Sequence, residues 1–251
     1  MTVNTDTSDS PPWKAQILTI FPEMFPGPLA LSLAGQGLKN KIWTLETINI
    51  RDFAQDKHQT VDDSTFGGGP GMVMRPDVVD AAIKSTSITS SNLPLLYLTP
   101  RGKTLTQCKI SELSKSPGVR IICGRYEGLD QRVVEANNAE ELSVSDFILS
   151  GGEPAAISLL DACVRLLPGI VGKKQSLIEE SFRDGLLEYA QYTRPKIWNG
   201  HEIPEVLLSG NHKQISRWRL ENAKITTESR RPDLWELYLQ KQNQTKKTGG
   251  I

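Results

Sequence analysis

Short apolar runs alternate with helix-like segments along the first two thirds of the chain. Runs typical of strands occupy residues 17–21, 43–50, 93–99, 119–123 and 143–149. Apolar residues at helical spacing occupy residues 28–39, 76–84, 104–114, 129–136 and 153–167. Short strands that alternate with helices form parallel sheets covered on both faces, so this pattern predicts an α/β fold. The segment 52–74, which contains FGGGPG, is predicted to be one long loop.

The pattern changes after Gly169, where polar sequence and then helical sequence follow. We expect a connector over residues 172–188 and a small, mainly helical domain over residues 189–240, with helices near 212–223 and 231–240. The region of strands and helices then forms a first domain over residues 16–171. The polar ends of the chain, residues 1–15 and 241–251, are expected to be disordered tails.

The composition is that of a globular protein, with 251 residues, 38% hydrophobic and 23% charged. No apolar run reaches the roughly 18–20 residues of a membrane helix, and the polar N-terminus is not a secretory signal. With only three cysteines and three histidines, the sequence argues against a disulfide framework and against a zinc cluster. We therefore expect a cytoplasmic protein without a membrane partner. The last 66 residues carry eleven Lys and Arg and seven Asp and Glu. This excess of positive charge is either ordinary variation along the chain or the sign of a surface that contacts a polyanion.

Gly- and Pro-rich turns follow three of the predicted strands: LTPRGK (98–103), CGRYEGLD (123–130) and LSGGEPAA (149–156). Ligands of open parallel sheets bind outside the carboxyl ends of the strands, and glycines let the backbone approach them closely. One such turn is ordinary turn chemistry, whereas three favour a single small-molecule pocket. Common nucleotide motifs do not fit, because Tyr97 stands where a P-loop needs glycine and FGGGPG lacks the G-x-G-x-x-G spacing.

Two basic features have both a structural and a functional interpretation. Arg165, at the end of the predicted helix 153–167, either pairs with Asp161 or places a cation beside the crevice. The segment RWR (217–219) suits phosphate contact and base stacking, and it also fits an amphipathic helix with Trp218 packed inward.

The connector is rich in carboxylates. Glu180, Asp184 and Glu188 would share one face if the segment were helical. Their spacing favours a solvated acidic face, and the alternative is a general base on a connector that closes over the pocket.

Eight strings occur together in this chain: FPEMF (21–25), RDFAQDKHQTVDD (51–63), FGGGPGMVM (66–74), CGRYEGLDQR (123–132), DFILSGGEPA (146–155), RLLPG (165–169), YTRP (192–195) and SGNHKQISRWR (209–219). In this order they closely resemble the TrmD family of bacterial tRNA (guanine-37-N1) methyltransferases, over residues 16–239. The resemblance implies the SPOUT fold, with a deep trefoil knot in the C-terminal half of the first domain, an exception among protein topologies. It also implies an obligate homodimer with active sites at the subunit interface.

The implied activity is methylation of N1 of guanine 37 in tRNA, next to the anticodon, which maintains the reading frame. The methyl donor is S-adenosylmethionine, bent into the knot and held largely by backbone groups, and no DNA partner is expected. The resemblance further implies a Mg²⁺ requirement, with ligands that the sequence does not locate. The implied cofactor residues are Tyr97, Leu98, Pro100, Gly124, Tyr126, Glu127, Ser143, Val144, Ser145, Asp146, Phe147, Ile148, Leu149, Gly151 and Gly152.

The resemblance also assigns catalytic and substrate residues. The arginine of the family's knot helix falls on Arg165, where it would stabilise charge on O6 of the guanine. The catalytic carboxylate falls on Glu180, where the family commonly has Asp before Ser-Phe, and Asp184 is a nearby substitute. The substrate residues implied are Asp63 and Gly69 near the glycine loop, and Asn211, His212, Arg217 and Arg219 in the C-terminal domain.

A second departure from the family pattern lies in the third turn, where Pro154 directly follows Glu153 and a common family form has Leu between them.

Two other functions stay open on the sequence alone. One is a knotted methyltransferase that acts on a different RNA base, and the other is an RNA-binding protein that kept the fold and lost catalysis. A phosphate-hydrolysing nucleotide enzyme is disfavoured by Tyr97.

Overall fold

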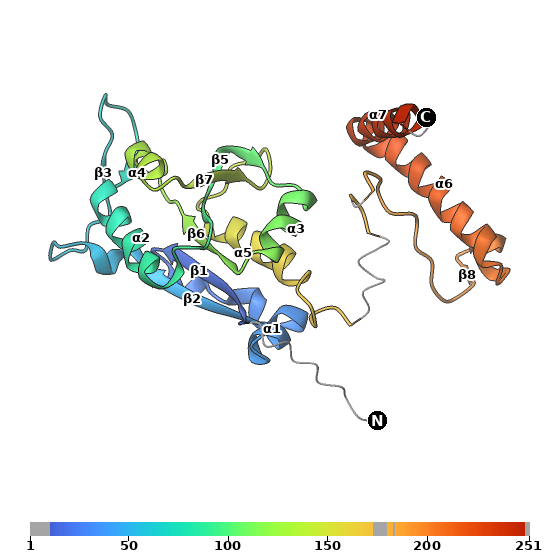
Figure 1. The fold of residues 1–251 in the computed structure, drawn as a ribbon, viewed down its shortest axis with the longest axis horizontal. Helices are drawn as coiled ribbons and strands as arrows, with labels where there is room; N and C mark the ends of the chain where they lie inside the picture. The colour runs from blue at the N-terminus through green and yellow to red at the C-terminus, as the bar shows by residue number, and fades with distance from the viewer. Residues whose placement is uncertain (1–10, 173–179, 183, 249–251) are drawn as a thin grey trace. The chain divides into compact units, whose positions relative to one another are not determined.

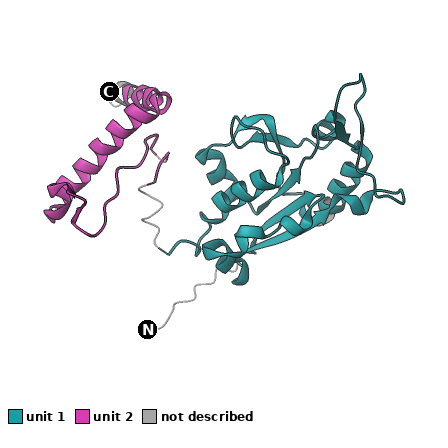
Figure 2. Ribbon diagram, turned by 180° about the vertical axis from the view of Figure 1, so that it is seen from behind, with its two compact units in different colours: residues 1–172 teal, residues 173–251 magenta. Residues whose placement is uncertain are grey.

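The computed structural model describes residues 11–172, 180–182 and 184–248, drawn as a ribbon in Figure 1. The chain divides into two compact units, residues 1–172 and 173–251, which Figure 2 distinguishes by colour. This division lies next to the predicted end of the first domain at residue 171. The predicted tails at 1–10 and 249–251, and the connector residues 173–179 and 183, lie outside the described residues.

Within the described part of unit 1, five parallel strands form one sheet in the order β2-β1-β6-β5-β7. The strands are β1 (Trp13–Thr19), β2 (Trp43–Asn49), β5 (Leu95–Thr104), β6 (Gly118–Cys123) and β7 (Glu140–Ser143). β1 lies between β2 and β6, and β5 lies between β6 and β7. The predicted α/β fold with a parallel sheet is confirmed.

Helices cover both faces of this sheet (Figure 1). One hydrophobic core joins the sheet to α1 (Ser32–Lys39), α3 (Gln107–Lys115) and α5 (Glu153–Val164). The other core joins it to α2 (Pro76–Ser90) and α4 (Gln131–Ala136). Because side chains alternate along a strand, Ile17 and Ile121 enter the first core and Leu18 and Ile122 enter the second.

Three sequence predictions in unit 1 are corrected by the structure. β1 begins at Trp13, inside the predicted tail, because the buried Trp13 indole donates to the Leu113 carbonyl at 3.2 Å. The predicted strand 143–149 is wrong: β7 ends at Ser143, and the apolar residues after it run as a loop. The predicted loop 52–74 contains a small antiparallel hairpin of β3 (Asp62–Ser64) and β4 (Met72–Met74).

Unit 2 is mainly helical, as predicted. It contains α6 (His212–Arg230), α7 (Pro232–Thr248) and a short hairpin of β8 (Ile197–Trp198) and β9 (His201–Glu202). α7 continues beyond residue 240 into the predicted C-terminal tail, because the Gln and Lys residues there are good helix formers. In the described chain, every helix is too short or too polar to span a bilayer.

Candidate functional site: a pocket at the carboxyl ends of three strands

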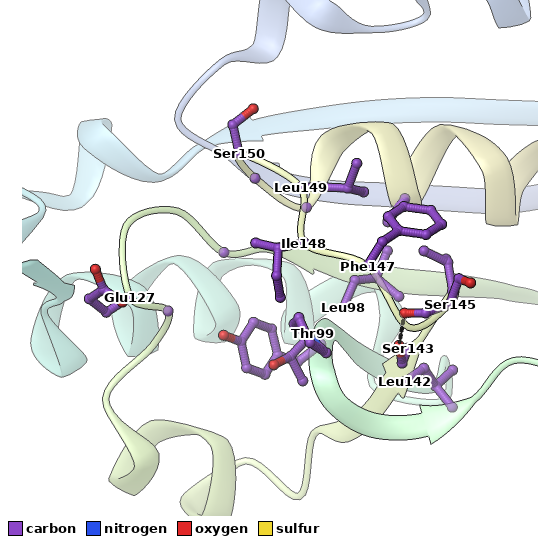
Figure 3. A pocket seen from close by; sticks show the side chains of 18 of the residues that line it. Leu98, Thr99, Glu127, Leu142, Ser143, Ser145, Phe147, Ile148, Leu149 and Ser150 are labelled. Carbon is purple, nitrogen blue, oxygen red and sulfur yellow. Dashed lines mark hydrogen bonds between the residues drawn. The ribbon is translucent and has the colours of Figure 1, made fainter. Parts of the chain in front are cut away.

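Residues of the three predicted turns line one pocket (Figure 3). The predicted first turn, 98–103, is part of strand β5, whose pairing with β7 shifts register between Leu98 and Lys103. The pocket therefore lies beside the middle of β5 and next to the ends of β6 and β7. Glu127 stands on one side of this pocket and Phe147 on the other. The lining residues are Tyr97, Leu98, Thr99, Pro100, Gly124, Tyr126, Glu127, Gly128, Leu142, Ser143, Val144, Ser145, Phe147, Ile148, Leu149, Ser150, Gly151, Gly152 and Ala155. Of the predicted cofactor residues that the structure describes, all line it except Asp146.

Sequence reasoning missed five of these lining residues. Thr99, Gly128, Leu142, Ser150 and Ala155 lie in the pocket wall beside predicted residues. Thr99, Gly128, Ser150 and Ala155 lie within the three turns, which is the signal that would have included them, whereas Leu142 lies in β7 and has no such signal. The pocket is therefore built by continuous stretches of chain and not by isolated side chains.

The second and third turns are in direct backbone contact. Gly152 N donates to the Gly124 carbonyl at 3.0 Å. A Cβ at Gly152 would come within 2.9 Å of Cys123 Cα, and a Cβ at Gly124 within 2.9 Å of the Tyr97 ring. Real Cβ atoms do not come so close, so the glycines permit the chain to pass here.

A buried ion pair joins the same two turns. The Glu153 side chain, at the start of α5, is fully buried, and its Oε2 accepts from Arg125 Nε at 2.9 Å. Its Oε1 accepts from the Thr19 hydroxyl at 2.7 Å, at the end of β1. Arg125 also donates to the Ser150 carbonyl at 3.2 Å, and its guanidinium lies 4.4 Å from the centre of the Phe21 ring. This pair was not predicted, although an acidic residue at the start of an apolar helix was a visible signal.

Polar groups inside the pocket wall are satisfied within the chain. The buried Tyr97 hydroxyl accepts from Leu129 N at 3.3 Å, and burial raises the pKa of Tyr97. Ser143 Oγ donates to the Ser145 carbonyl at 2.9 Å, drawn as a dashed line in Figure 3. The wall thus offers apolar surface and backbone groups, with few side-chain charges.

The glycine loop between β3 and β4 adjoins the second turn. Glu127 N donates to the Met72 carbonyl at 2.9 Å, and Met74 N donates to the Gly128 carbonyl at 2.9 Å. Asp63 and Gly69, the predicted substrate residues, belong to this hairpin, and neither appears among the described residues lining the pocket. Gly69 has a φ of +116°, and a Cβ there would meet no described atom within 4 Å.

The structure does not bring Arg165 to the pocket of its own chain. Arg165 caps the C-terminal end of α5, whereas Gly152 at the opposite end of α5 lines the pocket. At about 1.5 Å per residue, these two residues are separated by roughly 20 Å along the helix axis. In a single chain Arg165 is not among the described residues that line the pocket, and the expected cation beside the crevice stays a prediction.

The predicted catalytic carboxylates belong to unit 2. Glu180 and Asp184 line a second pocket there, together with Glu188, Tyr189 and Arg219. The guanidinium of Arg219 lies 4.8 Å from the centre of the Tyr189 ring. Glu180 and Asp184 thus share a pocket with one of the predicted RNA-binding residues.

The other predicted RNA-binding residues lie at the start of α6. The Asn211 side chain caps this helix by accepting from Gln214 N at 3.2 Å, so it has a structural role. His212 and Arg217 are exposed on the first turns of the helix. They are open to a partner with negative charge.

The expected Mg²⁺ requirement stays a prediction. Among residues 11–172, 180–182 and 184–248, no three His, Cys, Asp or Glu side chains gather closely enough to hold a metal ion. Mg²⁺ usually keeps several water ligands and takes only one or two carboxylates from a protein.

Comparisons with known proteins show the family to which the chain belongs. The model of the family described as "tRNA (Guanine-1)-methyltransferase TrmD" matches residues 13–237. Proteins named "tRNA (guanine-N(1)-)-methyltransferase" are similar over most of their length. One from Rhodopseudomonas palustris (strain TIE-1) is 56% identical over 89% of this chain and 90% of its own. One from Mesorhizobium japonicum is 58% identical over 88% of this chain and 96% of its own. The chain belongs to the TrmD family of tRNA (guanine-1)-methyltransferases.

Proposed function

We propose that the chain methylates N1 of guanine 37 in tRNA, next to the anticodon, with S-adenosylmethionine as the methyl donor. The observation that carries this proposal is the meeting of three glycine-rich turns in one pocket, in a chain of the TrmD family. Ligands of parallel sheets bind at such strand ends. Methylation at this position maintains the reading frame during translation.

The pocket residues fit the methyl donor. S-adenosylmethionine supplies an electrophilic methyl group on a sulfonium centre. Leu98, Phe147 and Ile148 offer apolar surface to its adenine ring, and the backbone of the glycine turns offers hydrogen bonds to the polar edges. The Glu127 carboxylate offers a negative charge to the cationic end of the ligand.

Glu180 is our proposed general base, with Asp184 as its substitute. Guanine N1 carries a proton and is a poor nucleophile, so a base must remove this proton as the methyl group is transferred. Negative charge then spreads to O6 of the guanine, where the Arg165 guanidinium would stabilise it. The anticodon loop is single-stranded, so the guanine can leave its stack at low cost.

A homodimer with shared sites is part of the proposal. Arg165 lies roughly 20 Å from Gly152 along α5 and therefore needs the pocket of a second copy. Large apolar side chains that could be covered by that copy are exposed in unit 1, among them Leu31 at 70% and Ile148 at 80%.

We also propose the knotted SPOUT arrangement for unit 1. Close backbone approaches support a tightly wound path, since a Cβ at Gly102 would overlap the backbone of Leu142 and one at Gly152 would crowd Cys123. In unit 2, the exposed His212 and Arg217 on α6 are proposed to contact the anticodon stem-loop.

Methyl transfer from labelled S-adenosylmethionine to two tRNA transcripts tests this function. One transcript has guanine at position 37 preceded by guanine, and the other has adenine at position 37. Label should appear in the first transcript only, at N1 of the guanine. Label in neither, while S-adenosylmethionine still binds, would contradict the proposed activity, and label at another base would contradict its position.

A further inference from the structure

We propose that Thr227 and Asn222 of α6 are positioning residues that hold the connector turn carrying Glu180. The inference rests on the proposed function, in which Glu180 removes the proton from guanine N1. It adds a physical link between the helix proposed to contact RNA and the group proposed to act on the base.

Residues 187–190, which span the end of the connector and the first residues after it, are bonded along one face of α6. Leu187 N donates to Thr227 Oγ1 at 2.8 Å, and Ala190 N donates to Asn222 Oδ1 at 2.7 Å. Tyr189, between these two residues, lies under the Arg219 guanidinium. Later connector residues meet earlier helix residues, so the segment runs antiparallel to α6.

Thr227 is a buried polar residue whose hydroxyl has two partners. It is fully buried, and its Oγ1 donates to the Ala223 carbonyl of the preceding helical turn at 2.7 Å. Its oxygen is thereby left as the acceptor for Leu187 N. Valine has the same shape without the hydroxyl, so it would lose the bond to Leu187 N together with the bond to the Ala223 carbonyl of the same helix.

Hydrogen bonds within the connector link Glu180 to the residues that are bonded to α6. Phe182 N donates to the Leu186 carbonyl at 2.8 Å, and Glu188 N donates to Ser181 Oγ at 3.0 Å. These bonds close a turn by joining residues 181 and 182 to residues 188 and 186, and the Leu186 side chain is buried. Glu180 directly precedes Ser181, so its backbone is tied to α6 through this turn.

A positioning role predicts a particular kinetic signature. Proton removal depends steeply on the distance between base and proton, so a loosened turn lowers kcat. S-adenosylmethionine should bind as before, since its proposed pocket is lined by residues of unit 1. The KM for tRNA should also stay unchanged as long as α6 itself remains folded.

The test compares Thr227→Val with Thr227→Ser, which restores the hydroxyl. Thr226→Val is the matched control, because it makes the same chemical change one residue earlier on α6. We expect Thr227→Val to lower kcat about tenfold, with both controls near wild type, and with the KM for tRNA and the Kd for S-adenosylmethionine within about twofold of wild type. Asn222→Ala and Asn222→Asp form a second such pair, since Asp keeps the acceptor for Ala190 N.

A double mutant separates positioning from a general loss of structure. If Thr227 acts through Glu180, Thr227→Val should lower kcat no further in a Glu180→Gln background. An equal loss in both backgrounds would overturn the proposal. So would equal kcat for the Val and Ser variants, or a raised KM together with lost helical circular dichroism.

Hydrogen exchange tests the anchorage without any need for activity. The Leu187 amide should be protected in wild type and in Thr227→Ser, and should exchange faster in Thr227→Val. Unchanged protection in Thr227→Val would overturn the anchorage itself. If wild type transfers no methyl group while these amides behave as expected, the proposed function fails and the anchorage stands.

Discussion

Glu153 is a charged side chain held entirely inside unit 1, with Arg125 and Thr19 as its partners. Breaking a buried ion pair leaves one charge without compensation, which costs about 3–5 kcal/mol. Glu153→Gln should therefore lower the unfolding free energy by about 3 kcal/mol in denaturant titrations. The matched control is Asp77→Asn at the exposed pair with Arg75, which should change it little. Equal effects from the two variants would show that the buried pair does not hold the turns together.

Tyr97 gives unit 1 a pH dependence with a defined sign. Burial raises the pKa of Tyr97, so the folded chain holds this proton more tightly than the unfolded chain does. The resulting stability is fully present below the ordinary tyrosine pKa near 10 and is lost as the pH rises through the folded value.

Tyr97→Phe tests this dependence. At pH 9 it should cost about 1 kcal/mol, because the Leu129 amide loses its acceptor. The difference from wild type should shrink as the pH rises above 10, measured by denaturant unfolding at each pH. A constant difference across this range would contradict a raised tyrosine pKa.

At the scale of elements, the contact between the second and third turns depends on the absence of a side chain at Gly152. Its φ of −77° suits any residue, so an added methyl group acts through crowding against Cys123 and not through backbone strain. Gly152→Ala should destabilise unit 1 by about 1–3 kcal/mol and weaken S-adenosylmethionine binding, measured by thermal unfolding and calorimetry. Gly172→Ala is the control, because a Cβ there would meet no described atom within 4 Å. Unchanged stability and binding in Gly152→Ala would mean that the turns separate easily.

The sequence predicted the elements well where local pattern determines them. The strand near Val119 and the helix beginning at Pro76 are confirmed, because buried strands and a proline-started helix have clear local signals. The strand at 143–149 was wrong because Phe147 and Ile148 resemble core residues, although their side chains are 56% and 80% exposed. An apolar run does not reveal whether it faces a core or a ligand or partner.

The candidate site was predictable in its turns and not in its tertiary links. Glycine after a strand marks a place for a ligand, so the three turns could be named in advance, whereas the individual cofactor residues came from the family resemblance. The Arg125–Glu153 pair depends on how segments of the chain are brought together. The pair joins two segments 28 residues apart, which no local pattern reveals, whereas the predicted helix 153–167 already placed Arg165 at the far end from Gly152.

At the scale of the whole molecule, the separation of Arg165 from its own pocket predicts complementation between subunits. Arg165→Ala and Phe147→Asp should each be nearly inactive in methyl transfer, the first through its missing cation and the second through a damaged pocket wall. In refolded mixtures of the two variants, half of the proposed homodimers would be mixed, and each would have one intact pocket facing one intact arginine. Mixed samples should therefore recover about a quarter of the wild-type rate. Recovery no greater than the average of the two single variants would contradict shared sites.

The strand order has a consequence for synthesis on the ribosome. β1 pairs with β2 on one side and with β6 on the other, and β6 is made roughly 70 residues after β2. At about 5–20 residues per second, the second edge of β1 stays open for roughly 4–14 s after β2 has emerged. An open apolar strand edge is a template for aggregation. The nascent chain is therefore a natural client for chaperones acting at the ribosome exit, before β6 closes the sheet.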